Sequence, residues 1–103
     1  MKKPNVLVVD DDLSVLAALK IILKSVAHVI TLQSPNKMMD TIAKHDIHVV
    51  LLDINIPNNS AKNLLSEIKS AYPDVQVIMV TALGKVNTVV EYMRNGAFSY
   101  IVK

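Results

Sequence analysis

The chain carries His48-Val49-Val50-Leu51-Leu52-Asp53, an apolar run that ends on a carboxylate. A second run, Val6-Leu7-Val8-Val9, ends on Asp10, Asp11 and Asp12. Strands that are apolar throughout are typical of parallel sheets, because both faces of such sheets are covered. Ligands bind at the carboxyl edge of these sheets, so we expect the two sets of carboxylates to meet there. This geometry indicates a divalent metal beside a carboxylate nucleophile.

Five short apolar runs alternate with helical patterns, an order typical of a parallel sheet whose strands are connected by helices. We expect strands at residues 5–9, 29–32, 48–52, 75–80 and 99–102. We expect helices at about 13–24, from 35 onward, after residue 60 and at about 86–94. The side chains expected to face the core are Leu16, Leu19, Ile22 and Leu23 in the first helix, Met38, Met39 and Ile42 in the second, and Leu64, Leu65 and Ile68 in the third.

The composition is that of one globular domain. A chain of 103 residues with 51% hydrophobic side chains can form a substantial core. No apolar stretch approaches the roughly 18 residues of a membrane span, and no secretory signal is readable, so we expect no membrane partner. The chain has no cysteine, and we expect a cytoplasmic protein. Its eleven Lys and Arg residues are scattered and its aromatic content is 4%, which argues against direct nucleic-acid binding.

The acidic residues allow two interpretations. Carboxylates that lie side by side repel one another, and a cation such as Mg²⁺, Mn²⁺ or Ca²⁺ resolves the conflict through hard oxygen ligands. In the simpler interpretation, Asp10, Asp11 and Asp12 form only a turn and a helix cap, and Asp53 is a solvated strand end. The placement of carboxylates at the ends of two different strands favours the metal site.

Four sequence blocks resemble the receiver domain of two-component response regulators. They are Val9-Asp10-Asp11, Leu52-Asp53-Ile54-Asn55-Ile56-Pro57, Val80-Thr81-Ala82 and Gly96-Ala97-Phe98-Ser99-Tyr100-Ile101-Val102-Lys103. The blocks occur in the family's order, and the resemblance runs the length of the chain. It implies an α/β, flavodoxin-like, doubly wound fold with a parallel five-stranded sheet in the order 2-1-3-4-5. It also implies a phosphorelay signalling switch that changes conformation to control a transcriptional output domain, rather than an enzyme.

The resemblance gives the acidic edge a specific chemistry. Asp53 is expected to accept a phosphoryl group from a sensor histidine kinase, with Mg²⁺ as cofactor. Asp11 is expected to bind Mg²⁺ directly and Asp10 directly or through water, with Asp53 and the backbone carbonyl of Asn55 completing the protein ligands. Phosphoryl transfer spreads negative charge over oxygens that a metal neutralises, so these roles are physically coherent.

The same resemblance assigns the remaining site residues. Thr81 would donate its hydroxyl to the phosphoryl group, the Ala82 amide would support it, and Lys103 would pair with a phosphoryl oxygen. Tyr100 resembles the family's switch aromatic, whose ring reorients when Thr81 moves. The sequence also allows simpler interpretations: Thr81 as a plain strand-end residue, Tyr100 as a half-buried strand residue and Lys103 as a frayed terminus.

Two positions and the region after Lys103 depart from the family pattern. Ala61 stands where many receivers have glycine, so the preceding loop is expected to differ in shape. Leu83 cannot orient a water molecule toward a phosphorylated aspartate, and we expect slow self-dephosphorylation. Receivers usually continue past the position of Lys103 with a proline and a fifth helix. We therefore expect residues 1–103 to be a single receiver domain truncated before that helix, with an output domain fused after Lys103, or a homodimer that covers the exposed face.

Two other functions remain open. A haloacid-dehalogenase-like phosphohydrolase also uses Mg²⁺ and a strand-end aspartate, but it needs an acid where this chain has Asn55. A pseudo-receiver would act as a phosphorylation-independent interaction module, and it would be expected to have lost one of the acidic, Thr or Lys positions. His28, His45 and His48 form no ligand cluster by spacing, and two of them flank the strand start opposite Asp53.

Overall fold

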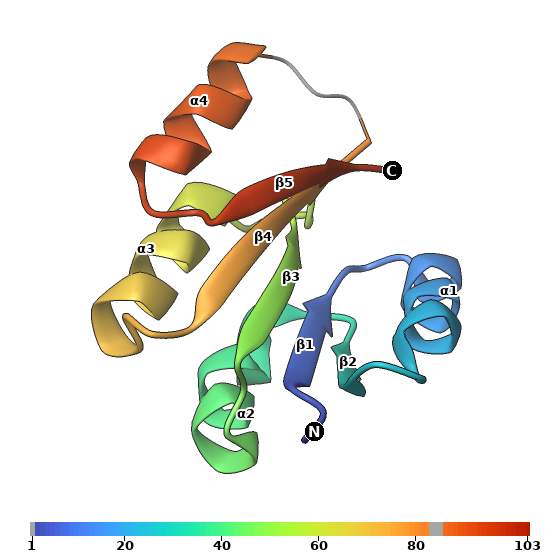
Figure 1. The fold of residues 1–103 in the computed structure, drawn as a ribbon. Coiled ribbons are helices and arrows are strands. Elements are labelled where there is room, and N and C mark those ends of the chain that lie inside the picture. The colour runs from blue at the N-terminus through green and yellow to red at the C-terminus, as the bar shows by residue number, and fades with distance from the viewer. Residues whose placement is uncertain (1, 83–85) are drawn as a thin grey trace.

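The computed structural model describes residues 2–82 and 86–103, which form an α/β fold (Figure 1). Its elements are β1 (Asn5–Val9), α1 (Leu13–Leu23), β2 (His28–Leu32), a 3₁₀ turn (Pro35–Lys37), α2 (Met38–His45), β3 (Val49–Asp53), α3 (Ala61–Ala71), β4 (Gln76–Thr81), α4 (Val86–Arg94) and β5 (Ser99–Val102). The first and last predicted strands match these bounds, the second begins one residue earlier than predicted, and the third and fourth are shifted by one residue at both ends. Strand ends follow backbone pairing, which side-chain patterns locate only approximately.

The five strands form one parallel sheet in the order β2-β1-β3-β4-β5. This confirms the predicted sheet order and fold class. In the register, Val9 lies opposite Leu52, and Asp53 lies opposite Val80. Thr81 lies opposite Val102 on the next strand. The carboxyl ends of β1, β3, β4 and β5 therefore lie along one edge of the sheet.

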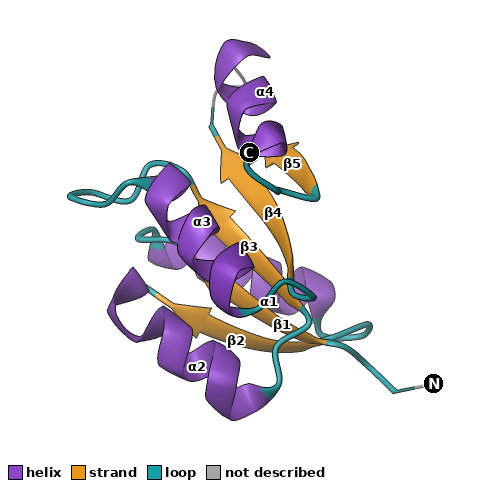
Figure 2. Ribbon diagram, turned by 90° about the vertical axis from the view of Figure 1, so that its left-hand side faces the viewer, coloured by secondary structure: helices purple, strands orange, loops and turns teal. Residues whose placement is uncertain are grey.

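Side chains alternate between the two faces of the sheet, as strand geometry requires. Leu52 and its neighbours on one face pack against α2 and α3, whereas Leu51 lies in a smaller cluster with Leu16 of α1. In Figure 2, α2 and α3 lie in front of the sheet and α1 lies behind it. The predicted core residues of α2 and α3, including Met38, Ile42 and Leu65, are confirmed. Both faces of β3 are thus covered, which explains its uninterrupted apolar sequence.

One predicted core residue was wrong. Ile22 of α1 is 67% exposed, whereas Leu16 is buried and Leu19 and Leu23 pack against it. An α-helix turns by about 100° per residue, so Ile22 lies roughly 120° around the helix from Leu16. Hydrophobicity marked Ile22 as a core residue, but its angular position does not.

β5 is the last element of the described residues. Ile101 lies opposite Val80 on the face that α1 covers, and it is 46% exposed. The predicted homodimer through this face stays a prediction.

Candidate functional site

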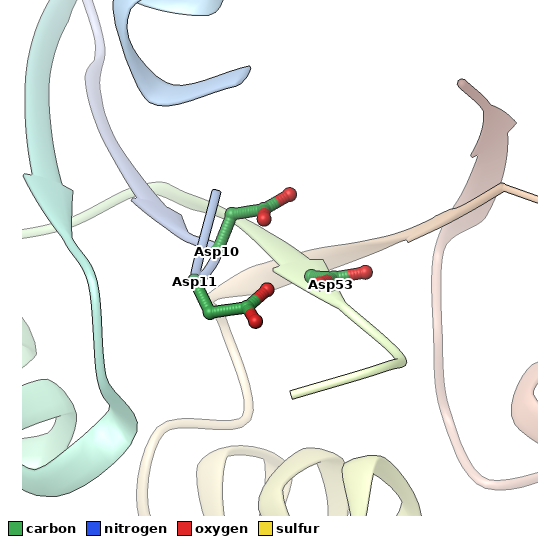
Figure 3. A group of neighbouring side chains, drawn as sticks. All are labelled: Asp10, Asp11 and Asp53. Carbon is green, nitrogen blue, oxygen red and sulfur yellow. The ribbon is translucent and has the colours of Figure 1, made fainter. Parts of the chain in front are cut away.

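Two buried carboxylates lie at the carboxyl edge of the sheet. Asp53 is the last residue of β3, and Asp10 directly follows β1. Their exposed fractions are 2% and 1%. The backbone N–H of Asp10 donates to Leu32 at the end of β2, which keeps the chain beside the sheet. Figure 3 shows the Asp10, Asp11 and Asp53 side chains gathered at this edge. The structure therefore brings together the two acidic strand ends that the sequence predicts to meet.

Backbone N–H groups hold the two buried carboxylates in place. The Asp12 N–H donates to Asp10 Oδ1 at 2.9 Å, and the Asn55 N–H donates to Asp53 Oδ1 at 3.3 Å. Asp12 itself accepts a hydrogen bond from the Ser14 N–H at 2.8 Å and caps α1. The helix-cap interpretation is thus correct for Asp12, while Asp10 and Asp11 face the site.

Lys103 is the cation of the site. Its Nζ lies 2.9 Å from Asp10 Oδ2 and 3.3 Å from Asp53 Oδ1. Its side chain is 26% exposed. The Lys103 backbone N–H donates to the Thr81 carbonyl at 2.7 Å, so β5 pairing places the lysine at the edge of the sheet. Lys103 therefore lies within the site, in contact with both buried carboxylates. Its contact with Asp10 was not anticipated from sequence, because pairing partners on distant strands leave no local signal.

Burial and neighbouring charges shift the pKa values of Asp53 and Lys103. Burial raises the pKa of Asp53, and Asp10 adds to the rise, while the Asn55 N–H and Lys103 oppose it. Burial works against the charge of Lys103, but its hydrogen bond to Asp10 and the attraction of Asp53 outweigh this and raise its pKa. The site thus stabilises the protonated, charged form of Lys103. It disfavours the charged form of Asp53.

The carboxylates of Asp10, Asp11 and Asp53 fit a divalent cation. One oxygen from each lies within 4.8 Å of the others. Three carboxylates face one ammonium, so the group carries an excess of negative charge even with Lys103 in contact. Hard oxygen ligands suit Mg²⁺, which takes one or two carboxylates directly, reaches others through water, and fills its shell with water and phosphate oxygens. Asn55, on the exposed turn after β3, lies two residues beyond Asp53.

Thr81 and Tyr100 line the same narrow cavity beneath α4. Thr81 ends β4 and is buried, with 2% exposed, while Tyr100 on β5 is 46% exposed. Ile54 and Met79 complete the wall next to the sheet. The structure therefore brings the two predicted switch residues together. Ala82 follows Thr81 as an exposed residue, and the prediction about Leu83 lies outside the described residues.

Ala61 and two of the histidines can also be placed in the structure. Ala61, where many receivers have glycine, is buried as the first residue of α3 and follows the Ser60 cap. His45 and His48 lie at the end of the sheet opposite Asp53, as predicted. In the described residues, no helix is long and apolar enough to cross a membrane.

Comparisons with known proteins agree with this geometry. The model of the response regulator receiver domain family matches residues 6–103. The chain is 34% identical over 100 residues to the response regulator protein FleR of Pseudomonas aeruginosa, covering 96% of this chain and 21% of FleR. It is 30% identical to the transcriptional regulatory protein ZraR of Escherichia coli, covering 96% of this chain and 23% of ZraR. The chain thus spans less than a quarter of the length of these relatives.

Solved structures show the same fold. The BeF3-activated receiver domain of DrrB, a Thermotoga maritima protein, superposes with a TM-score of 0.89 at 27% identity. The superposition covers 99% of this chain and 86% of that one.

Proposed function

We propose that this chain, which belongs to the response regulator receiver domain family, is a phosphorylation switch whose phosphoacceptor is Asp53. The observation that carries the proposal is the buried Asp53 carboxylate, 3.3 Å from the Lys103 ammonium and grouped with Asp10 and Asp11. A nucleophile, a cation and a set of metal ligands are the parts that phosphoryl transfer needs. The expected donor is the phosphohistidine of a sensor histidine kinase.

In the proposed reaction, a carboxylate oxygen of Asp53 attacks the phosphorus of the donor. The new O–P bond forms as the P–N bond of phosphohistidine breaks, and the imidazole nitrogen keeps the electron pair. Lys103, now shared by Asp10 and Asp53, turns its ammonium to a phosphoryl oxygen. This exchange keeps a positive charge beside the negative charge that arrives on Asp53.

Asp10, Asp11 and the Asn55 backbone carbonyl are the residues that would hold Mg²⁺ with Asp53. When bound, Mg²⁺ supplies positive charge that offsets the charge on the phosphoryl oxygens. The Asp12 N–H keeps one Asp10 oxygen oriented, which leaves the other for Lys103 or the metal. Thr81 and the Ala82 amide would donate to the remaining phosphoryl oxygens.

The switch uses the narrow cavity that Thr81 and Tyr100 share. When Thr81 moves toward the phosphoryl group, it vacates part of this cavity, and the Tyr100 ring takes the space. The half-exposed position of Tyr100 supports this motion, because the ring can leave solvent without breaking the core. The resulting change on β5 and α4 would control an output domain. The proposed output is transcriptional, in keeping with the name of ZraR.

The test is phosphorylation by acetyl phosphate in the presence of Mg²⁺, followed by intact mass. We expect the wild type to gain one phosphoryl group and Asp53→Asn to gain none. Glu67→Gln is the matched control, since it removes an exposed carboxylate from α3 away from the site.

Each other outcome identifies a different function. An adduct on Asp53→Asn would contradict the assignment of the phosphoacceptor. Release of phosphate without an adduct would indicate a phosphohydrolase, and no reaction at all would indicate a phosphorylation-independent interaction module.

A further inference from the structure

A second concave site lies at the opposite end of the sheet from Asp53. It is a hollow of about 440 Å³, open to solvent on one side, between the C-terminal ends of α2 and α3. The chain enters β3 and β4 here, through His48 and Val75. His48 precedes Asp53 by five strand positions, or roughly 16 Å at 3.3 Å per residue. The hollow is therefore separate from the phosphoacceptor site.

The buried part of the hollow's lining, its floor, is apolar. Ile42, Ile47 and Val75 line it and are at most 6% exposed. Tyr72, at the end of α3, adds a partly buried aromatic ring that packs on the same core. A volume of this size with an apolar floor and a few polar groups is typical of small-molecule sites. The part of a ligand that would fit against this floor is thus a small apolar or aromatic group.

The charges around the hollow are acidic. Asp46 and Asp74 both line it, and none of the lining residues is Lys or Arg, although the whole chain carries a net charge of +2. Within the described residues, Asp74 has no ion-pair partner, and Asp46 lies only near His48, with 4.0 Å between Oδ2 and Nε2. The C-terminal ends of α2 and α3 add the negative ends of two helix dipoles.

A lysine ammonium lies at the border of the hollow without pairing with its carboxylates. Lys69 of α3 donates its ammonium to the carbonyls of Pro73 and Val75, at 2.8 and 2.9 Å. It braces the turn that follows α3, and it contacts neither carboxylate. An apolar floor with an acidic border and a nearby aromatic ring favours a cation on an apolar body.

We propose that this hollow binds a small organic cation, an ammonium group attached to an apolar or aromatic body. The apolar body occupies the floor formed by Ile42, Ile47 and Val75. The ammonium lies toward Asp46 and Asp74. The proposal is independent of phosphoryl transfer, since no residue of the hollow belongs to the Asp53 site.

The test uses three probes with the same body and different charge: phenethylamine, 2-phenylethanol and phenylacetate. Binding is followed by ¹H–¹⁵N NMR titration of the 103-residue chain. We expect shifts at the Ala43, Asp46 and Asp74 amides with phenethylamine, affinity about tenfold lower for the alcohol, and no binding of the acid. Equal binding of the three probes, or no shifts with millimolar phenethylamine, would overturn the proposal.

Variants distinguish binding in the hollow from attraction by general surface charge. Asp46→Asn and Asp74→Asn should each weaken phenethylamine binding roughly two- to fivefold. Asparagine tolerates the left-handed backbone of Asp46, whose φ is 51°. Glu67→Gln, which removes a charge outside the hollow, should leave binding unchanged. Ala43→Leu narrows the hollow while keeping both carboxylates, and it should weaken binding.

The two proposals can fail separately. Unchanged binding in Ala43→Leu, with a native-like spectrum, would show that the hollow is not the site. Asp53→Asn should bind phenethylamine like the wild type, and Ala43→Leu should still accept a phosphoryl group from acetyl phosphate.

Discussion

The two ends of the sheet carry acidic side chains in opposite environments. At the carboxyl edge, Asp10 and Asp53 are almost fully buried and share the ammonium of Lys103. At the amino end, the Asp46 side chain is 94% exposed, and the His48 Nε2 atom beside it is 4.0 Å away. Burial removes the water that would screen a charge, so each contact at the carboxyl edge has a large energetic effect. Exposed charges at the amino end have small effects on stability.

The largest effect is expected from Lys103→Met, which leaves two buried carboxylates without their cation. We expect a loss of roughly 1–3 kcal/mol in the free energy of unfolding at pH 7, measured by urea denaturation in EDTA. The pKa of Lys103 is raised in the folded protein above its ordinary value of 10.5. Its stabilising contribution is therefore present below pH 10.5 and is lost as the pH rises through the folded pKa. A variant as stable as the wild type would show that charges at the buried carboxyl edge affect stability no more than exposed charges at the amino end.

The next largest effect is expected from Mg²⁺. At a concentration ten times its dissociation constant, Mg²⁺ should raise the free energy of unfolding by about 1.4 kcal/mol, because it binds the folded state alone. Asp11→Asn removes an exposed ligand and should reduce this gain. Asp40→Asn, an exposed acid on α2, is the control and should retain it. If Mg²⁺ stabilises Asp11→Asn as much as the wild type, the proposed ligand set is wrong.

At the amino end, we expect Asn5→Ala to cost about 1 kcal/mol. The Asn5 side chain donates to the carbonyls of His45 and Asp46 at 2.8 and 3.2 Å, and it ties β1 to the end of α2. Both bonds are exposed, so water replaces them in the variant. Thermal denaturation of the two proteins measures the difference. A loss larger than that of Lys103→Met would reverse the ranking of the two ends.

The smallest effect is expected from Asp53→Asn, because the influences on Asp53 oppose one another. Burial raises the pKa of Asp53 above its ordinary value of 3.8, so the folded state favours the protonated form. The stabilising contribution of Asp53 is present below pH 3.8, and it is lost as the pH rises through the pKa of Asp53 in the folded protein.

In metal-free buffer the variant should therefore unfold at a higher temperature than the wild type at pH 7. The difference should vanish under acidic conditions. A variant less stable than the wild type at pH 7 would mean that the attraction of Lys103 outweighs the burial of Asp53.

Most of the fold could be predicted from the sequence. Continuous apolar runs such as Val49 to Leu52 predict strands covered on both faces, and their alternation with helices predicts a parallel sheet. The error at Ile22 has a geometric cause, because hydrophobicity alone does not fix the angular position of a residue on its helix. The one-residue differences at strand ends arise because backbone hydrogen bonds, not side chains, set those ends.

Less of the two sites could be predicted. The acidic strand ends were found because both Asp10 and Asp53 follow apolar runs, and parallel strands bring such ends to one edge. The Asp10–Lys103 contact and the hollow between α2 and α3 join segments that are distant in sequence. Neither leaves a local pattern.

The sequence by itself determined the elements, their order, the acidic strand ends and the resemblance to the receiver family, because these depend on local periodicity and short motifs. Only the tertiary structure decided which carboxylates are buried, that Lys103 contacts both of them, and that Asp46 and Asp74 border a hollow. The physical reason is that burial and charge pairing depend on distances between separate elements, and packing sets those distances.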